Sequence, residues 1–136
     1  MNEKITMTDI EEATTHTSCD YGVPIKDASI WRDKLTKIVD RRPLCVVANW
    51  IYWDIEYSDE DTATLKEKGF LPAAIFSKNI IWDEQNRWPR GYCVKTTFLK
   101  YFEHNCLFHT QNTSYLLAGP GSRCTISPAI FNGIHF

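Results

Sequence analysis

The chain has 136 residues, a length that fits one domain and allows a buried core without a disulfide or metal staple. Hydrophobic residues make up 43% of it and charged residues 24%, which is ordinary for a globular protein, while 5 Trp, 6 Tyr and 7 Phe favour strands. The formal net charge of −2 argues against a general nucleic-acid binder, which needs a basic face.

Residues 1–26 are polar and Thr-rich, and we expect them to form a loosely attached arm of a single domain spanning 1–136. Thr8 and Glu11 have the spacing of a capping box, which predicts one short helix there. The sequence shows no apolar run typical of a signal peptide and no stretch near the ~18 apolar residues of a membrane span. We therefore expect a cytoplasmic protein that does not contact a membrane.

Five cysteines occur at wide spacings without a CxxC pair: Cys19, Cys45, Cys93, Cys106 and Cys124. This pattern is neither that of a zinc site nor that of a secreted disulfide framework. We expect buried free thiols in a reducing compartment, and no metal or cofactor.

Two helices are predicted before residue 70. Residues 28–40 carry apolar side chains on one face of a 3.6-residue period, namely Trp31, Leu35, Ile38 and Val39. Residues 59–68 form the second helix, because Ser58 can cap its start and Gly69 can supply the left-handed position after its end.

Residues 44–57 predict a strand that is covered on both faces, because apolar residues occupy both alternating sets. Strict alternation places Leu44, Val46, Trp50 and Tyr52 on one side. It places Val47, Ile51, Trp53 and Ile55 on the other side, with a bend expected near Asn49.

After Pro72 the chain alternates short apolar segments with turns. Strands are predicted over 73–82, 92–102, 106–110, 113–118 and 123–127. Connections this short cannot contain a crossover helix, so we expect these strands to pair as an antiparallel meander. The predicted fold class is α+β: a four- to five-stranded antiparallel meander over about 73–127, the buried strand 44–57, and two or three helices packed on it.

Four sequence features occur in order between residues 69 and 121: Gly-x-x-Pro at 69–72, a strand ending in Asp83, the segment RWPRGYCVKTTFL, and the hairpin CLFHTQNTSYLLAGPG. With them the chain resembles an uncharacterised domain family of short proteins in pseudomonads, related proteobacteria and their prophages. It departs from that pattern at Lys95, where Arg is expected, and at His109, where an acidic residue is common. The resemblance implies a β-rich fold and a bacterial or phage origin, hence a bacterial host cytoplasm, but no activity.

The loop 83–91 is the first candidate for a binding surface. It places Arg87, Trp88 and Arg90 close together, and Arg and Trp are enriched at the centres of protein interfaces. The alternative is an ordinary hairpin loop whose Trp88 folds back over the sheet.

The start of the helix 59–68 is the second candidate, since Asp59, Glu60 and Asp61 can meet a basic partner. These carboxylates equally suit the helix dipole, which favours negative charge in the first turn.

A Thr- and Asn-rich hairpin is a candidate small-molecule pocket, with Thr96, Thr110, Asn112 and Arg123 as its expected wall. Hydroxyl groups on one strand face can line a polar site, although Thr also favours strands and Asn favours turns.

No catalytic residue is predicted. Cys106 and His109 lie three apart on one strand, so their side chains point to opposite faces. A pair formed by Cys93 with His104 or His109 across strands stays open. No clustered His or carboxylate motif indicates a metal site.

The expected function is that of a non-enzymatic protein-binding module, specifically a phage- or mobile-element-encoded, anti-CRISPR-like inhibitor of a bacterial defence or nucleic-acid-processing complex. Small size, the lack of a catalytic motif and the many aromatic residues motivate it. Two alternatives are an immunity or antitoxin protein that occludes a cognate toxin, and a small-molecule or nucleotide-binding protein that uses the Thr/Asn-rich hairpin. The expected partner is another protein, without direct nucleic-acid binding.

Overall fold

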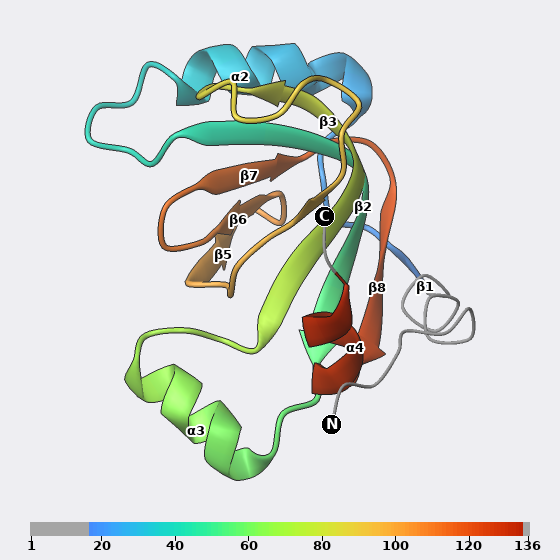
Figure 1. Ribbon diagram of the computed structural model, residues 1–136. Coiled ribbons are helices and arrows are strands. Elements are labelled where there is room, and N and C mark those ends of the chain that lie inside the picture. The colour runs from blue at the N-terminus through green and yellow to red at the C-terminus, as the bar shows by residue number, and fades with distance from the viewer. Residues whose placement is uncertain (1–16, 135–136) are drawn as a thin grey trace.

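A computed structural model describes residues 17–134, and the predicted helix around Thr8 and Glu11 lies outside this range. Within residues 17–134 an eight-stranded mixed sheet and helical segments form an α+β fold, the class predicted from the sequence, with more strands than predicted (Figure 1). The strands are β1 Thr17–Cys19, β2 Leu44–Ile55, β3 Ala73–Asp83, β4 Val94–Lys95, β5 Tyr101–Glu103, β6 Leu107–His109, β7 Ser114–Leu117 and β8 Gly121–Ile126. The helical segments are η1 Ile25–Asp27, α2 Ala28–Leu35, α3 Asp59–Glu67 and α4 Pro128–Gly133.

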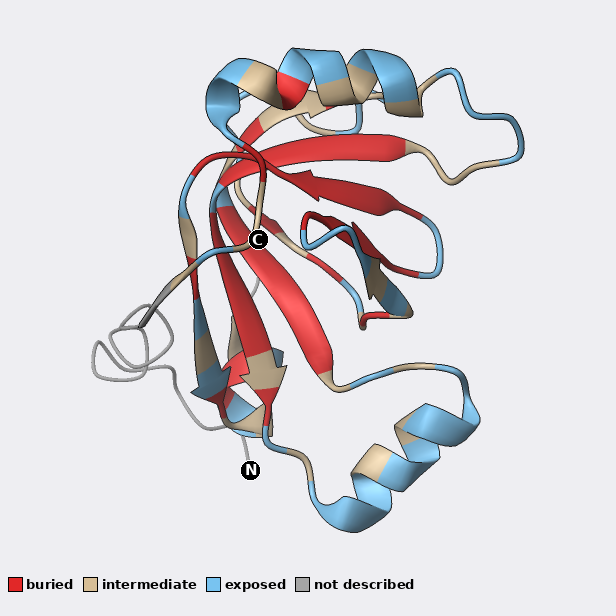
Figure 2. Ribbon diagram, turned by 180° about the vertical axis from the view of Figure 1, so that it is seen from behind, coloured by how far each residue is buried: buried red, intermediate tan, exposed pale blue. Residues whose placement is uncertain are grey.

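Strand β2 is the centre of the sheet, and its apolar sequence is buried on both faces as predicted (Figure 2). On one edge it pairs with antiparallel β3, from Cys45 opposite Asp83 to Asp54 opposite Ala73. On the other edge it pairs with two parallel strands in succession, β7 along its first part and β8 along its second part.

A break at Asn49 divides β2 into two parts. Asn49 has a φ of +49°, in the left-handed region that Asn tolerates better than most residues. The predicted bend is therefore present, but strict alternation across it is wrong. Trp50 and Tyr52 share a buried cluster with Val47, whereas Val46 belongs to a different cluster, because the break shifts the alternation by one residue.

The Trp50 side chain packs at the junction between the end of β7 and the start of β8. The residue is 1% exposed, and its indole nitrogen donates a hydrogen bond to the carbonyl oxygen of Gly119 at 3.2 Å. Gly121 lies directly against the ring, since a Cβ added there would come within 2.2 Å of a ring carbon. The missing side chain at residue 121 therefore lets β8 approach β2.

Strands β5, β6 and β7 form an antiparallel meander, as predicted. The predicted strand 92–102 is interrupted, because only β4 and β5 within it pair as strands. Between them the chain follows β3, with Leu99 donating its backbone N–H to the carbonyl of Ala73. Lys100 then donates to the carbonyl of His109 in β6, so this segment connects two parts of the sheet.

The predicted meander is also wrong for β7 and β8, which lie end to end along β2 instead of pairing with each other. Short connections exclude a crossover between sequence neighbours, but they do not exclude pairing with a strand far earlier in the chain. Both strands pair with the edge of β2 that lies opposite β3. The bend at 118–121 connects them at the level of the break at Asn49.

The sheet buries apolar side chains on both faces. One face holds a cluster that includes Trp50, Tyr52 and Phe108. On the other face α2 packs against a cluster around Val46, and α4 packs against a cluster around Trp53. Helix α4 was not predicted, although Ser127 caps it by accepting a hydrogen bond from the N–H of Ile130 at 3.2 Å.

Helix α2 ends at Leu35 instead of the predicted residue 40. The Thr36 hydroxyl donates to the carbonyl of Arg32 at 2.8 Å, and Arg41 reaches back to the carbonyl of Thr36 at 3.1 Å. Such contacts satisfy the last carbonyls of a helix. Ile38 and Val39, predicted on the buried face, therefore lie in the loop 36–43 and are 56% and 81% exposed.

Helix α3 confirms the second predicted helix, with the N–H of Asp61 donating to the Ser58 hydroxyl at 3.1 Å and Gly69 at a φ of +87°. It contains no buried residue and lies away from the sheet (Figures 1 and 2). The expectation that this helix packs on the sheet is therefore wrong. Its low hydrophobicity leaves it little to bury.

None of the five cysteines, all within residues 17–134, forms a disulfide. Burial raises the pKa of Cys45 to about 12 and that of Cys106 to about 11, which keeps both thiols protonated and unreactive. None of the helices in the described part of the chain has the length and apolar character that crossing a membrane requires.

We expect Gly121→Ala to lower the free energy of unfolding by about 3 kcal/mol or more, because its Cβ overlaps the buried Trp50 ring. Gly91→Ala is the control: its Cβ meets nothing within 4 Å and only its φ of +91° is strained, so a loss of about 1 kcal/mol is expected. Urea unfolding monitored by tryptophan fluorescence measures both. Equal losses would show that Trp50 does not press on residue 121.

Candidate functional site

A pocket of about 580 Å³ opens at the end of α2, between the loop 36–43 and the meander β5–β7. This volume suits a small organic ligand. Its apolar lining comes from Leu35, Ile38, Leu44 and Leu107. Its polar and aromatic lining comes from Asp40, Arg41, Arg42, Tyr101, Glu103, His109, Gln111 and Ser114.

Strand register brings the polar groups of this pocket together. His109 in β6 pairs with Ser114 in β7 and with Tyr101 in β5. Paired residues in a sheet point to the same face, and Glu103 is the diagonal neighbour of His109 on that face. The turn that joins β5 to β6 has positive φ at His104 and Asn105, which suits a tight hairpin.

The His109 ring is hydrogen-bonded at both nitrogens. Its Nδ1 lies 2.7 Å from the Ser114 hydroxyl, and its Nε2 lies 2.9 Å from a carboxylate oxygen of Glu103. An ionised carboxylate only accepts hydrogen bonds, so we assign the ring proton to Nε2. Nδ1 then accepts a hydrogen bond from Ser114, which gives a chain from hydroxyl through imidazole to carboxylate.

Burial favours the neutral form of this imidazole. His109 is 7% exposed, and desolvation lowers its pKa, although the hydrogen bond and charge of Glu103 act in the opposite direction. The Tyr101 ring stacks on the imidazole with centroids 4.2 Å apart and planes at 20°. The ring is therefore fixed by two hydrogen bonds and one stacking contact.

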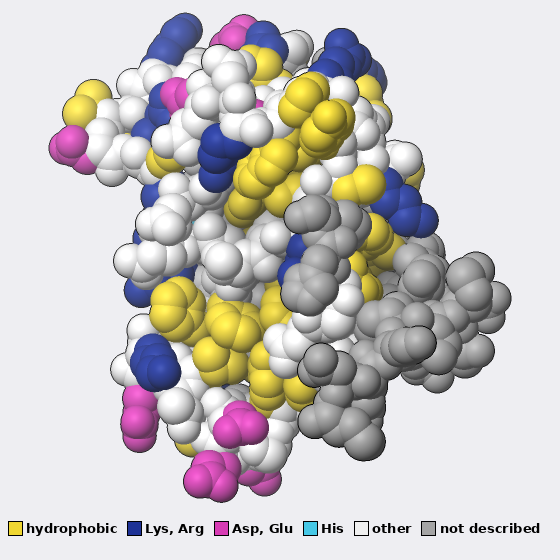
Figure 3. Space-filling model, in the orientation of Figure 1, with side chains coloured by type: hydrophobic (Ala, Val, Ile, Leu, Met, Phe, Trp, Pro, Cys, Tyr) yellow, Lys and Arg dark blue, Asp and Glu magenta, His cyan; other side chains and the backbone are white. Residues whose placement is uncertain are grey.

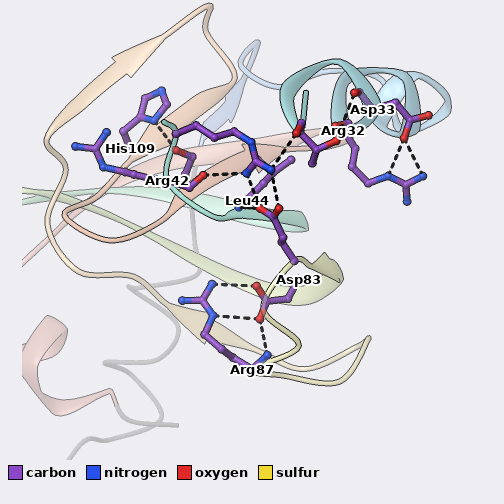
Figure 4. Close-up of polar contacts among 11 residues, drawn as sticks. Arg32, Asp33, Arg42, Leu44, Asp83, Arg87 and His109 are labelled. Atoms are coloured by element: carbon purple, nitrogen blue, oxygen red, sulfur yellow. Dashed lines mark hydrogen bonds and ion pairs between the residues drawn. The ribbon is translucent and has the colours of Figure 1, made fainter. Parts of the chain in front are cut away.

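Arg42 lies beside His109 at the rim of the pocket (Figure 4). Its guanidinium lies 5.5 Å from the Tyr101 ring centroid and donates to the carbonyl of Gln111 at 3.3 Å. Arg42 forms no ion pair with a carboxylate of residues 17–134. Its positive charge is thus available to a ligand.

Arg41, unlike Arg42, forms an ion pair within the domain, with Glu84. It donates to both carboxylate oxygens of Glu84, one of them at 2.6 Å, and that carboxylate also accepts from the N–H of Leu44 at 2.9 Å. The hydrogen bond from Arg41 lowers the pKa of Glu84 to about 2. This pair holds the loop 36–43 against the start of β2 and the end of β3.

In the loop 83–91, which was predicted as a binding surface, Arg87 and Trp88 make contacts within the domain. Arg87 holds the buried carboxylate of Asp83 with two nitrogens at 3.0 and 3.1 Å (Figure 4). It also donates to the Thr113 hydroxyl at 3.0 Å. Its guanidinium lies 4.4 Å from the centroid of the Trp88 ring, which is partly buried against the core. Arg90 is exposed.

The predicted acidic residues Asp59, Glu60 and Asp61 are exposed in the first turn of α3. Figure 3 shows acidic side chains gathered at the end of the molecule where α3 lies. No contact within residues 17–134 draws them together with the loop 83–91 or with the pocket.

The residues predicted to wall a Thr/Asn pocket serve separate structural roles. Thr96 is buried and accepts from the N–H of Ile75, while Thr110 is buried and bonds to the backbone of Thr113. Asn112 is exposed in the same turn as Thr110. Arg123 lies on β8, where it pairs with Asp54 at 2.6 and 2.8 Å.

The sequence reasoning missed Ser114 and Glu103 as partners of His109. A usable signal was present, because a hairpin turning at residues 111–112 places His109 directly opposite Ser114. The open pairing of Cys93 with His104 or His109 is not formed. The Cys93 thiol lies 3.9 Å from the carbonyl of Lys78, both His109 nitrogens are engaged elsewhere, and His104 lies 3.9 Å from a carboxylate oxygen of Glu103.

Within residues 17–134, no three His, Cys, Asp or Glu side chains lie close enough together to hold a metal ion.

Residues 22–132 match a family described as a domain of unknown function, DUF6957, and the chain belongs to that family. The match confirms the resemblance to an uncharacterised domain family and extends it beyond residues 69–121. Comparison with curated proteins gave no match, and comparison with solved structures gave none.

We expect Glu84→Gln to destabilise the fold at pH 7 by about 1–3 kcal/mol, because it removes a charge-assisted pair. The pKa of Glu84 is about 2 in the fold against an ordinary 4.5, so its stabilisation is present above pH 4.5. It is lost as the pH falls toward 2, and the difference between variant and wild type should shrink over that range. Glu56→Gln, at an exposed position, is the control. A Glu84→Gln effect that is constant from pH 7 to pH 2 would contradict this.

Proposed function

We propose that this domain binds a small organic molecule in the pocket at the end of α2. The observation that carries the proposal is a buried imidazole, hydrogen-bonded at both nitrogens, in the wall of a pocket of about 580 Å³. Polar groups that converge in a hollow beside apolar side chains are a common feature of ligand sites. This develops the small-molecule alternative expected from the sequence, with His109, Gln111 and Ser114 in place of the residues predicted there.

The lining favours a ligand with an apolar or aromatic body and one anionic group. Ile38 and the partly exposed Leu35 offer apolar contact area, and Tyr101 offers an aromatic ring at the rim. Arg42 offers a planar guanidinium without a carboxylate partner among the described residues, which suits a carboxylate or a phosphate.

The test is a thermal-shift screen of the purified chain against nucleoside phosphates and aromatic carboxylates, followed by calorimetry on the compounds that raise Tm. Arg42→Gln should weaken such binding about tenfold or more, because it removes a charged hydrogen-bond donor. Arg90→Gln, an exposed arginine on another loop, is the matched control and should bind normally. A panel without any response, or binding that ignores Arg42→Gln, would sink the proposal.

A second candidate is the protein-binding module expected from the sequence, acting in a bacterial host cytoplasm as an inhibitor of a defence complex or as an immunity protein against a toxin. It is favoured by Ile38 and Val39, which expose aliphatic side chains on the loop 36–43 beside the pocket. Arg42 and Tyr101 add the residue types that are common at interface centres. On this view the contact surface is the loop 36–43 more than the loop 83–91.

An affinity pull-down from bacterial lysate tests it with three chains: wild type, Ile38→Ser with Val39→Ser, and the control Ile30→Ser on the exposed side of α2. A partner retained by wild type and by the control, but lost with the loop variant, is expected. Identical partner sets for all three chains would remove the loop from this role.

A further inference from the structure

The hydrogen-bonded chain in the pocket has the arrangement of an activated nucleophile. Ser114 Oγ lies 2.7 Å from His109 Nδ1, and Glu103 lies 2.9 Å from the opposite nitrogen, so a base within reach of a hydroxyl is itself oriented by a third group. We propose that Ser114 is a nucleophile and that the pocket hydrolyses small carboxylic esters. This inference rests on the proposed function, since the ester must enter the same pocket.

The fold fixes this arrangement more firmly than a surface contact would. His109 and Ser114 are each 7% exposed and are register partners on adjacent strands. The backbone N–H of Ser114 donates to the carbonyl of Pro43 at 2.9 Å, which anchors the serine to the chain ahead of β2. Tyr101 stacks on the imidazole, so the ring has little freedom to turn away from the hydroxyl.

The chemistry balances with water as the co-reactant. Ser114 Oγ bonds to the ester carbonyl carbon while its proton passes to His109 Nδ1, and Glu103 stabilises the resulting imidazolium. The bond from the carbonyl carbon to the alcohol oxygen then breaks, and His109 returns the proton to the departing alcohol. Water attacks the acyl-serine by the same route, which releases a carboxylic acid and restores the hydroxyl.

Arg42 is the arginine of the pocket lining that has no carboxylate partner among the described residues, and its role in this proposal is to stabilise the negative charge that develops on the carbonyl oxygen. Arg41, the other arginine of the lining, is neutralised by Glu84. Preorganised positive charge near such an oxygen is a large contribution to acyl transfer. Glu103 acts through His109 and is a positioning residue.

The experiment treats the full chain with a biotinylated fluorophosphonate and locates the adduct by peptide mass spectrometry, with p-nitrophenyl butyrate hydrolysis measured in parallel. The adduct is expected on Ser114 in the wild-type chain. Ser114→Ala should abolish labelling and hydrolysis, whereas Ser122→Ala, another buried strand serine, should retain both. His109→Gln should slow labelling about 10²-fold or more.

Glu103→Gln should lower kcat for the ester with little change in KM, because it affects the base and not ester binding. A wild-type adduct elsewhere, no adduct at all, or labelling unaffected by His109→Gln overturns the inference, and the wild-type spectrum decides even where a variant fails to fold. Ligand binding that depends on Arg42 without any Ser114 adduct overturns this inference alone. If neither Arg42-dependent ligand binding nor a Ser114 adduct is observed, the proposed function is overturned as well.

Discussion

The structure depends on strand β2 and its two parallel partners. β7 pairs with β2 before the break at Asn49, and β8 pairs with it after the break, so one strand organises both halves of the sheet. The Trp50 ring occupies the junction, where Gly121 leaves room for it. Burial of large aromatic side chains supplies much of the stability of such a core, so this junction adds to the β2–β3 ladder that spans both halves of the sheet.

The same pairing builds the pocket. Ser114 opposes Leu44 at the start of β2, which brings the β6–β7 hairpin beside the loop 36–43 although the two are far apart in the sequence. The loop stays there because Arg41 binds Glu84 at the end of β3. The polar groups of His109, Ser114 and Glu103 converge through the β5–β7 meander itself. Arg42 and the loop 36–43 join them only because β7 also lies along β2, so a complete site at this position depends on long-range pairing.

Local signals predicted much of the fold. The Ser58 cap and Gly69 predicted α3, apolar residues on both alternating sets predicted β2, a short apolar segment after Pro72 predicted β3, and the α+β class followed from these elements. Long-range pairing could not be predicted in this way, because nothing local distinguishes a β7–β8 hairpin from two strands that share the edge of β2. The candidate site could be predicted only in part for the same reason. The loop around Trp88 has the composition of an interface, but Arg87 in it neutralises Asp83. Ser114 lies beside its partner His109 only because of the strand register.

Amide NOEs between backbone protons in solution test the central pairing most directly. The account predicts contacts in parallel register between β2 and β7, such as Val46 with Leu116, and between β2 and β8, such as Trp53 with Cys124. It also predicts slow hydrogen exchange at Ala118, whose N–H donates to the carbonyl of Val47. Cross-strand contacts that pair β7 with β8 around residues 119–120, with none from either strand to β2, would contradict it.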